Sequence, residues 1–170
     1  MTNRGSFDYI RQRRRYAVFC FVYLHGLIAG FLYTTQYTIS SLMRLLVYPQ
    51  MSIVWGCLVS VIPFIVFYIF LRCSAYYFLL PLAFLKAFTF MYCFAGISIA
   101  YADAGWLVRL LLLFADCFLV PLFLWFAGRS LLHKQEKLNK DIWICIFVIL
   151  AVRCVDSYVI SPFTMKLLLF

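Results

Sequence analysis

Five charged side chains stand inside segments of this sequence that are otherwise almost entirely apolar. They are Lys86, Arg109, Asp116, Arg153 and Asp156. If these segments cross a membrane, each charge costs at least a few kcal/mol unless it is paired, hydrated or needed for function. Such side chains can relay protons or ions, bind a polar partner, or fix the packing of helices. The choice between these roles depends on the elements that position the charges.

The composition indicates an integral membrane protein. Of the 170 residues, 66% are hydrophobic, 21% are aromatic and only 12% are charged, which is far from the usage of a soluble domain. Spanning segments of about 20 residues each consume almost the whole length. We therefore expect an all-α bundle of transmembrane helices that forms a single membrane domain.

Hydropathy divides the chain into five expected membrane helices. They follow a basic N-terminal segment, 1–15, and the absence of a cleavage site after the first apolar run indicates a retained anchor. A short interfacial helix is expected within 35–51. Gly128 is expected to end the fourth helix, and Ser161 with Pro162 to end the fifth. The expected spans are residues 16–34, 52–71, 75–100, 106–127 and 142–160, with a basic loop at 128–141.

The distribution of basic residues predicts the orientation of the bundle. The net charge is +9. The segments on the same side of the membrane as the N-terminus hold ten arginines and lysines, and the segments on the opposite side hold two, Arg44 and Lys166. This asymmetry predicts a cytoplasmic N-terminus and an outside C-terminus. Because the basic groups adjoin hydrophobic spans, we expect them to contact anionic lipid headgroups and not nucleic acid. The candidates for this contact are Arg11, Arg13, Arg14, Arg15, Arg129, Lys134, Lys137 and Lys140.

This topology places the intramembrane charges at different depths. At about 1.5 Å of rise per residue, Lys86 and Asp116 each lie about 16 Å from an edge of the apolar core, near its centre. We expect these two to pair between the third and fourth helices. Arg109 and Asp156 lie about 6 Å below the outer edge by the same rise. They could form a second pair, or a triad with Arg153, which lies one turn deeper.

Two interpretations of these charges stay open. Arg109 and Asp116 are seven residues apart, so they share a face that should look into the bundle. A proton or ion relay, or a polar surface for a partner, would use such a face. Paired charges that fix helix register would use it equally well, and we prefer this structural interpretation for a small chain without internal repeats.

Small residues predict where helices approach each other closely. Gly26 and Gly30 form a G-x-x-x-G pair, and Gly96 with Ala100 forms a similar one. Such pairs favour helix packing and leave a homo-oligomer possible. The seven cysteines are scattered singly, so neither a disulfide framework nor a zinc site is expected. Because no catalytic motif is present, we expect no enzyme activity, no catalytic residue, no metal and no cofactor.

The second half of the chain, from about residue 80 to 162, resembles the stage II sporulation protein M family. The likeness lies in the runs PLAFLKAFTFMYCFAG and LLFADCFLVPLFLWFAG, the basic loop after them, and the closing DSYVISP. Within these runs Lys86 follows Phe-Leu, and Asp116 precedes a mid-helix proline by five residues. Asp156 stands shortly before a tyrosine and a Ser-Pro. The first half departs from the family, whose segment between the first two helices is usually longer.

The resemblance implies a non-enzymatic scaffold or anchor in a bacterial cell membrane. In spore-forming bacteria the family member acts during engulfment of the forespore and positions peptidoglycan hydrolases at the septal membrane. The expected partners are therefore the lipid bilayer and membrane-associated cell-wall enzymes. The alternative is a small transporter or permease subunit in which Lys86, Arg109, Asp116 and Asp156 line a path.

Overall fold

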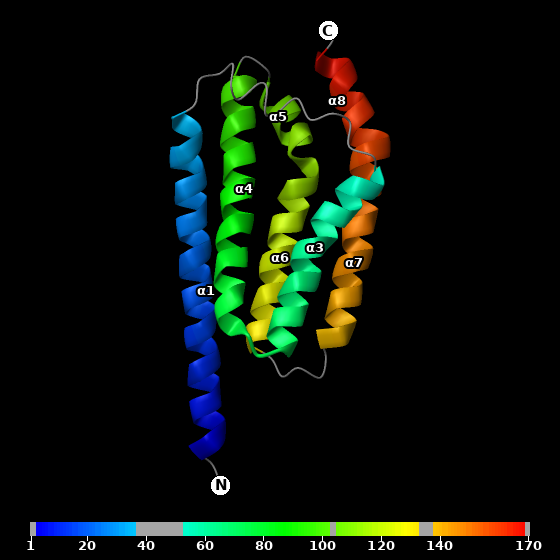
Figure 1. Cartoon of the computed structure of the whole chain (residues 1–170). Coiled ribbons are helices and arrows are strands. Elements are labelled where there is room, and N and C mark those ends of the chain that lie inside the picture. The colour runs from blue at the N-terminus through cyan, green and yellow to red at the C-terminus, as the bar shows by residue number, and fades with distance from the viewer. Residues whose placement is uncertain (1–2, 37–52, 103–104, 133–137, 169–170) are drawn as a thin grey trace.

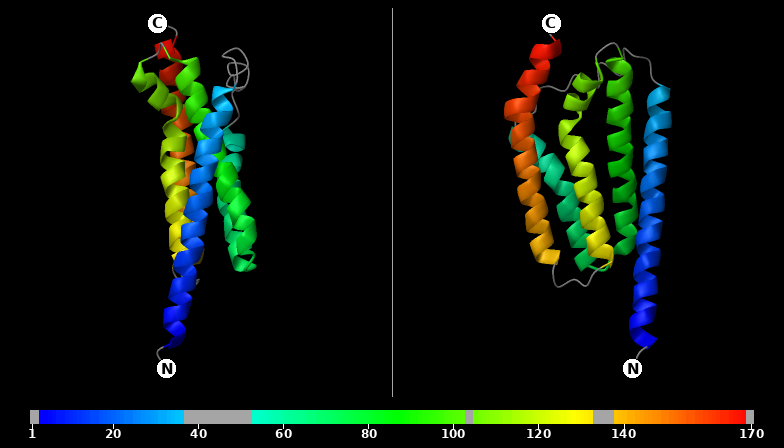
Figure 2. Two further views of the ribbon diagram at one scale, coloured as in Figure 1. Left: turned by 90° about the vertical axis from the view of Figure 1, so that its left-hand side faces the viewer. Right: turned by 180° about the vertical axis from the view of Figure 1, so that it is seen from behind.

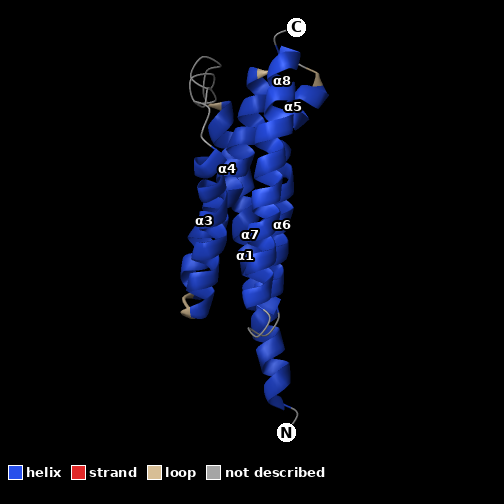
Figure 3. Ribbon diagram, turned by 90° about the vertical axis from the view of Figure 1, so that its right-hand side faces the viewer, coloured by secondary structure: helices blue, strands red, loops and turns tan. Residues whose placement is uncertain are grey.

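The computed structural model of this chain describes residues 3–36, 53–102, 105–132 and 138–168. These residues form helices and turns, and they contain no strand (Figure 3). The expected interfacial helix at 35–51 lies almost wholly outside them, as do Lys134 and Lys137. The elements are α1 (Asn3–Thr35), α3 (Ile53–Arg72), η1 (Tyr76–Phe78), α4 (Leu79–Ala100), α5 (Trp106–Leu112), α6 (Phe114–Leu132), α7 (Leu138–Val155), η3 (Asp156–Ile160) and α8 (Ser161–Leu168).

Within the described residues, five stretches of helix are long and apolar enough to cross a membrane. They are Ile10–Thr35, Ile53–Arg72, Tyr76–Ala100, Phe114–Leu132 and Asn139–Leu167. This result confirms the all-α, five-span membrane bundle that the hydropathy predicts. The start of α1 and the end of α8 lie at opposite ends of the bundle (Figure 1), as an odd number of spans requires.

The helices run side by side in two groups. The long helix α1 lies against α4, while α3, α6 and α7 form the other group (Figure 1). The first turns of α1 project beyond the lower ends of the other helices (Figure 2). We call the end that holds these turns, the α3–η1 turn and the facing ends of α6 and α7 the basic end.

Aromatic side chains fill the core toward the basic end. Phe19 of α1, Phe67 of α3 and Phe123 of α6 are fully buried. The ring centroids of Phe19 and Phe67 are 5.8 Å apart with perpendicular planes, and those of Phe67 and Phe123 are 5.7 Å apart at 82°. Edge-to-face pairs of this kind add about 0.5–1.5 kcal/mol each beyond the burial of area. They join three helices that are distant in sequence.

The G-x-x-x-G pair of α1 makes the contact with α4. A Cβ atom added at Gly26 would lie 2.5 Å from the Phe84 carbonyl oxygen, and one added at Gly30 would lie 2.5 Å from the Phe88 carbonyl oxygen. Only glycine lets the two backbones approach this closely. The pair is therefore used within the chain and is covered by α4. Gly96, the third predicted packing glycine, is buried in α4.

The predicted end of the fourth helix at Gly128 is wrong. The helix α6 continues to Leu132, and Gly128 is buried inside it. A Cβ at Gly128 would lie 3.3 Å from the ring of Tyr16 on α1. This glycine makes room for an aromatic ring, so its presence reflects helix packing and not a helix stop.

The predicted break of the fifth helix at Ser161 and Pro162 is also wrong. The helical path continues from α7 through η3 into α8, and η3 is a π-helical segment. Pro162 has no N–H to donate to the preceding turn. The wider π turn places an extra residue just before it, and the Ser161 N–H bonds to the Asp156 carbonyl. Short π segments of this kind occur often at functional sites.

Candidate functional site

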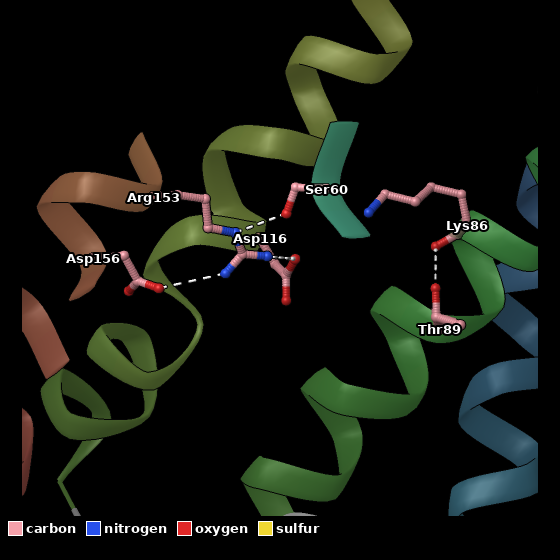
Figure 4. A network of polar contacts seen from close by, with 6 residues as sticks. All are labelled: Ser60, Lys86, Thr89, Asp116, Arg153 and Asp156. Atoms are coloured by element: carbon pink, nitrogen blue, oxygen red, sulfur yellow. Dashed lines mark hydrogen bonds and ion pairs between the residues drawn. The ribbon is translucent and has the colours of Figure 1, made fainter. Parts of the chain in front are cut away.

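Arg153 of α7 is the centre of a charged cluster within the spans. Its Nε donates to Ser60 Oγ of α3 at 2.8 Å. Its Nη1 donates to Asp156 Oδ2 at 3.4 Å, and its Nη2 lies 4.0 Å from Asp116 Oδ1 of α6. All three guanidinium nitrogens thus face an oxygen, each from a different element (Figure 4). The planar fork of arginine suits such divided contacts better than the compact ammonium group of a lysine does.

Local structure positions each partner of Arg153. Ser60 lies one helical turn before the fully buried Phe64 in α3. Its side chain is therefore buried at the edge of the aromatic core that faces away from the basic end. Asp156 follows Arg153 by three residues and begins η3, so the two share a face of the helix. Asp116 stands in the first turn of α6. The cluster therefore ties α3, α6 and the α7–η3 junction together.

The predicted pairing of Lys86 with Asp116 is not the one observed. Among the described residues the ion-pair partner of Asp116 is Arg153, and no ion pair within 4.0 Å involves Lys86. The Lys86 side chain nevertheless extends from α4 toward the cluster (Figure 4). Lys86 thus lies near the cluster but makes no ion pair with its members.

The predicted pairing of Arg109 with Asp156 is not observed either. Within the described chain Asp156 pairs with Arg153, and Arg109 Nε is buried without a hydrogen-bond partner. The reason is a break in the fourth helix. The helix α5 ends at Leu112 and α6 begins at Phe114, so Arg109 and Asp116 do not share the face of one continuous helix.

The break consists of one turn residue, Leu113, between α5 and α6. Leu113 N–H bonds to the Arg109 carbonyl, and Cys117 N–H bonds to the Leu113 carbonyl. At a break of this kind some N–H and carbonyl groups lie outside the bonding pattern of either helix. Interrupted helices at membrane depth need protein, water or a ligand around them to satisfy such groups.

The carboxylates of the cluster are not fully covered by the chain. The Asp116 side chain is 32% exposed, and those of Asp156 and Arg153 are each 23% exposed. The arrangement can hold helices in register, and it can also present charge to a neighbouring molecule or to water. The contacts of Arg153 are one hydroxyl and two carboxylates.

A second set of polar contacts lies at the basic end. Arg129 Nε donates to Asp141 Oδ2 at 2.8 Å, and the Asp141 side chain is only 8% exposed. Arg72 Nη2 donates to Asn139 Oδ1 at 2.7 Å, and the Tyr68 hydroxyl donates to the same oxygen at 2.6 Å. These contacts join α3 and α6 to the start of α7.

Sequence reasoning missed Ser60, Asp141 and Asn139. Ser60 stands alone in an apolar run, and hydropathy does not distinguish Asp141 and Asn139 from ordinary loop residues. Their spacing from apolar neighbours does not indicate which residue each one contacts.

No protein-family model, curated protein or solved structure matches this chain. The structure and composition identify a multi-pass membrane protein in a lipid bilayer.

Proposed function

We propose that this protein is a non-enzymatic membrane scaffold that positions cell-wall-remodelling partners at a bacterial cell membrane. The resemblance of residues 80–162 to the stage II sporulation protein M family suggests this role and its link to sporulation and engulfment. The cytoplasmic side of the bundle would be the basic end, by the positive-inside rule.

One observation carries the proposal. Arg153 directs all three of its guanidinium nitrogens to oxygens of the same chain, from Ser60, Asp116 and Asp156. In this role Arg153 and the two carboxylates brace α3, α6 and α7 against one another. A stable bundle with fixed surfaces is what a scaffold requires.

The test is affinity purification of the tagged full-length chain from membranes of its native host, with and without a chemical crosslinker. A peptidoglycan hydrolase, or a membrane protein that binds one, should be enriched over a tagged five-span control protein of unrelated sequence. If no cell-wall enzyme is enriched under either condition, the scaffold proposal is wrong.

A transporter or permease subunit is the second candidate function, and two observations favour it. Lys86 extends toward the cluster without an ion pair within 4.0 Å in the described chain. The break between α5 and α6 also lies beside Asp116, and interrupted helices often line substrate paths in transporters. Purified protein in liposomes should then carry protons or ions, and Asp116→Asn should abolish the flux. A flux that Asp116→Asn leaves unchanged would remove this candidate.

A further inference from the structure

Three arginines at the basic end are each held against an aromatic ring. They come from three different helices, and we call them the rim arginines. The guanidinium carbon lies 5.3–5.5 Å from the ring centroid in every case, which is within the range of a cation–π contact. The pairs are Arg15 with Tyr76, Arg72 with Tyr68, and Arg129 with Trp125.

Further contacts fix two of these groups in place. Arg72 donates from Nε to the Tyr68 hydroxyl at 3.1 Å and from Nη2 to Asn139. Arg129 donates from Nε to Asp141. These bonds leave other Nη N–H groups for an outside acceptor, and the Arg129 side chain is 40% exposed while Arg72 is exposed. A guanidinium that is already ordered loses little entropy when it binds a phosphate.

The charge around the rim arginines is strongly positive. Arg11, Arg14 and Lys140 lie at the same end and are exposed. The one acid among the described side chains of this end, Asp141, is buried and bound to Arg129. Arginine beside tyrosine and tryptophan, at the end of membrane-spanning helices, is typical of the depth at which lipid headgroups lie. A ligand complementary to this end therefore carries negative charge.

We propose that the rim arginines form a binding surface for the phosphate groups of anionic phospholipids in the adjacent leaflet. Arg15 stands beside Tyr16, whose ring packs on Gly128, so Arg15 and Arg129 flank the contact between α1 and α6. Arg11 lies one turn, or about 6 Å, further along the projecting part of α1. The rim arginines bind headgroups directly, whereas the projecting arginines add only a diffuse attraction.

Two double variants with equal loss of charge separate these contributions. In Arg15→Gln/Arg72→Gln two rim arginines are lost, and in Arg11→Gln/Arg14→Gln two projecting arginines are lost. Native mass spectrometry of the purified full-length protein, titrated with phosphatidylglycerol or phosphatidylcholine, counts the bound lipids. An inorganic phosphate titration, read by thermal unfolding, distinguishes a free anion from a lipid headgroup.

The rim variant should bind phosphatidylglycerol about fivefold more weakly for each arginine lost, and the projecting variant should stay near the parent. Phosphatidylcholine binding should be equal in all three, and phosphate should not raise the unfolding temperature. If the rim variant does not fold, Arg15→Lys/Arg72→Lys is compared with Arg11→Lys/Arg14→Lys. An equal loss in the rim and projecting variants, or stabilisation by free phosphate alone, would overturn the proposal.

Discussion

Arg153 of α7 and Ser60 of α3 are joined by a 2.8 Å hydrogen bond inside the membrane-spanning part of the bundle. The same guanidinium faces the carboxylates of Asp116 and Asp156. A serine hydroxyl has a spare lone pair for this purpose, and its burial at 2% exposure means that no water replaces the bond if it is lost. This relationship makes Arg153 the residue on which the packing of three helices depends.

Replacing Arg153 should destabilise the protein more than replacing any of its partners. Arg153→Met leaves two carboxylates without their cation, and we expect a loss of about 3 kcal/mol in the free energy of unfolding. Unfolding in mixed micelles, followed by circular dichroism, measures the change. Adding Asp116→Asn and Asp156→Asn to Arg153→Met should recover part of the loss. A triple variant no more stable than Arg153→Met alone would speak against the cluster.

The contact between α1 and α4 predicts a glycine effect that depends on position. Gly26→Ala and Gly30→Ala each place a methyl group against a backbone carbonyl of α4, which cannot move aside as a side chain can. We expect each substitution to lower the free energy of unfolding by about 1–3 kcal/mol. Gly56→Ala is the matched control, because nothing lies within 4 Å of its added Cβ. An equal effect at Gly26 and Gly56 would refute the close contact.

The Arg129–Asp141 pair predicts unequal effects of its two neutral variants. Asp141 is buried, so Arg129→Gln leaves a carboxylate without its charged partner and should cost about 2 kcal/mol or more. Asp141→Asn leaves an arginine that is 40% exposed and can reach water, so its effect should be smaller. The same unfolding assay compares the two variants. A larger loss for Asp141→Asn would show that the burial of Asp141 is not what makes the pair important.

Hydropathy was sufficient to predict the class of fold and the number of spans. Long apolar runs specify membrane helices because the bilayer allows few other structures, and the positions of Arg72 and Arg129 near helix ends followed from the same runs. The Gly26 and Gly30 spacing also indicated a close helix contact. The spacing alone does not identify the helix that these glycines contact, which is α4 of the same chain.

The partners of the charged residues could not be predicted in the same way. The pairing of Lys86 with Asp116 rests on a depth counted along one continuous fourth helix, and the structure divides that helix at Leu113. The assumed stop at Pro162 placed Arg153 one helical turn deeper than Asp156, in the outer half of the span. The continuation through η3 instead puts Arg153 at the middle of the span Asn139–Leu167. Both errors come from local backbone irregularities that hydropathy does not report.

If Arg153 braces the bundle, it must be energetically coupled to its carboxylate partners Asp116 and Asp156. The most direct test is a pair of double-mutant cycles on the free energy of unfolding, which share Asp116→Asn and combine it with Arg153→Met or Lys86→Met. We expect a coupling energy of at least about 1 kcal/mol between Asp116 and Arg153, and a smaller one between Asp116 and Lys86. No coupling to Arg153, or a larger coupling to Lys86, would contradict the bracing role of Arg153.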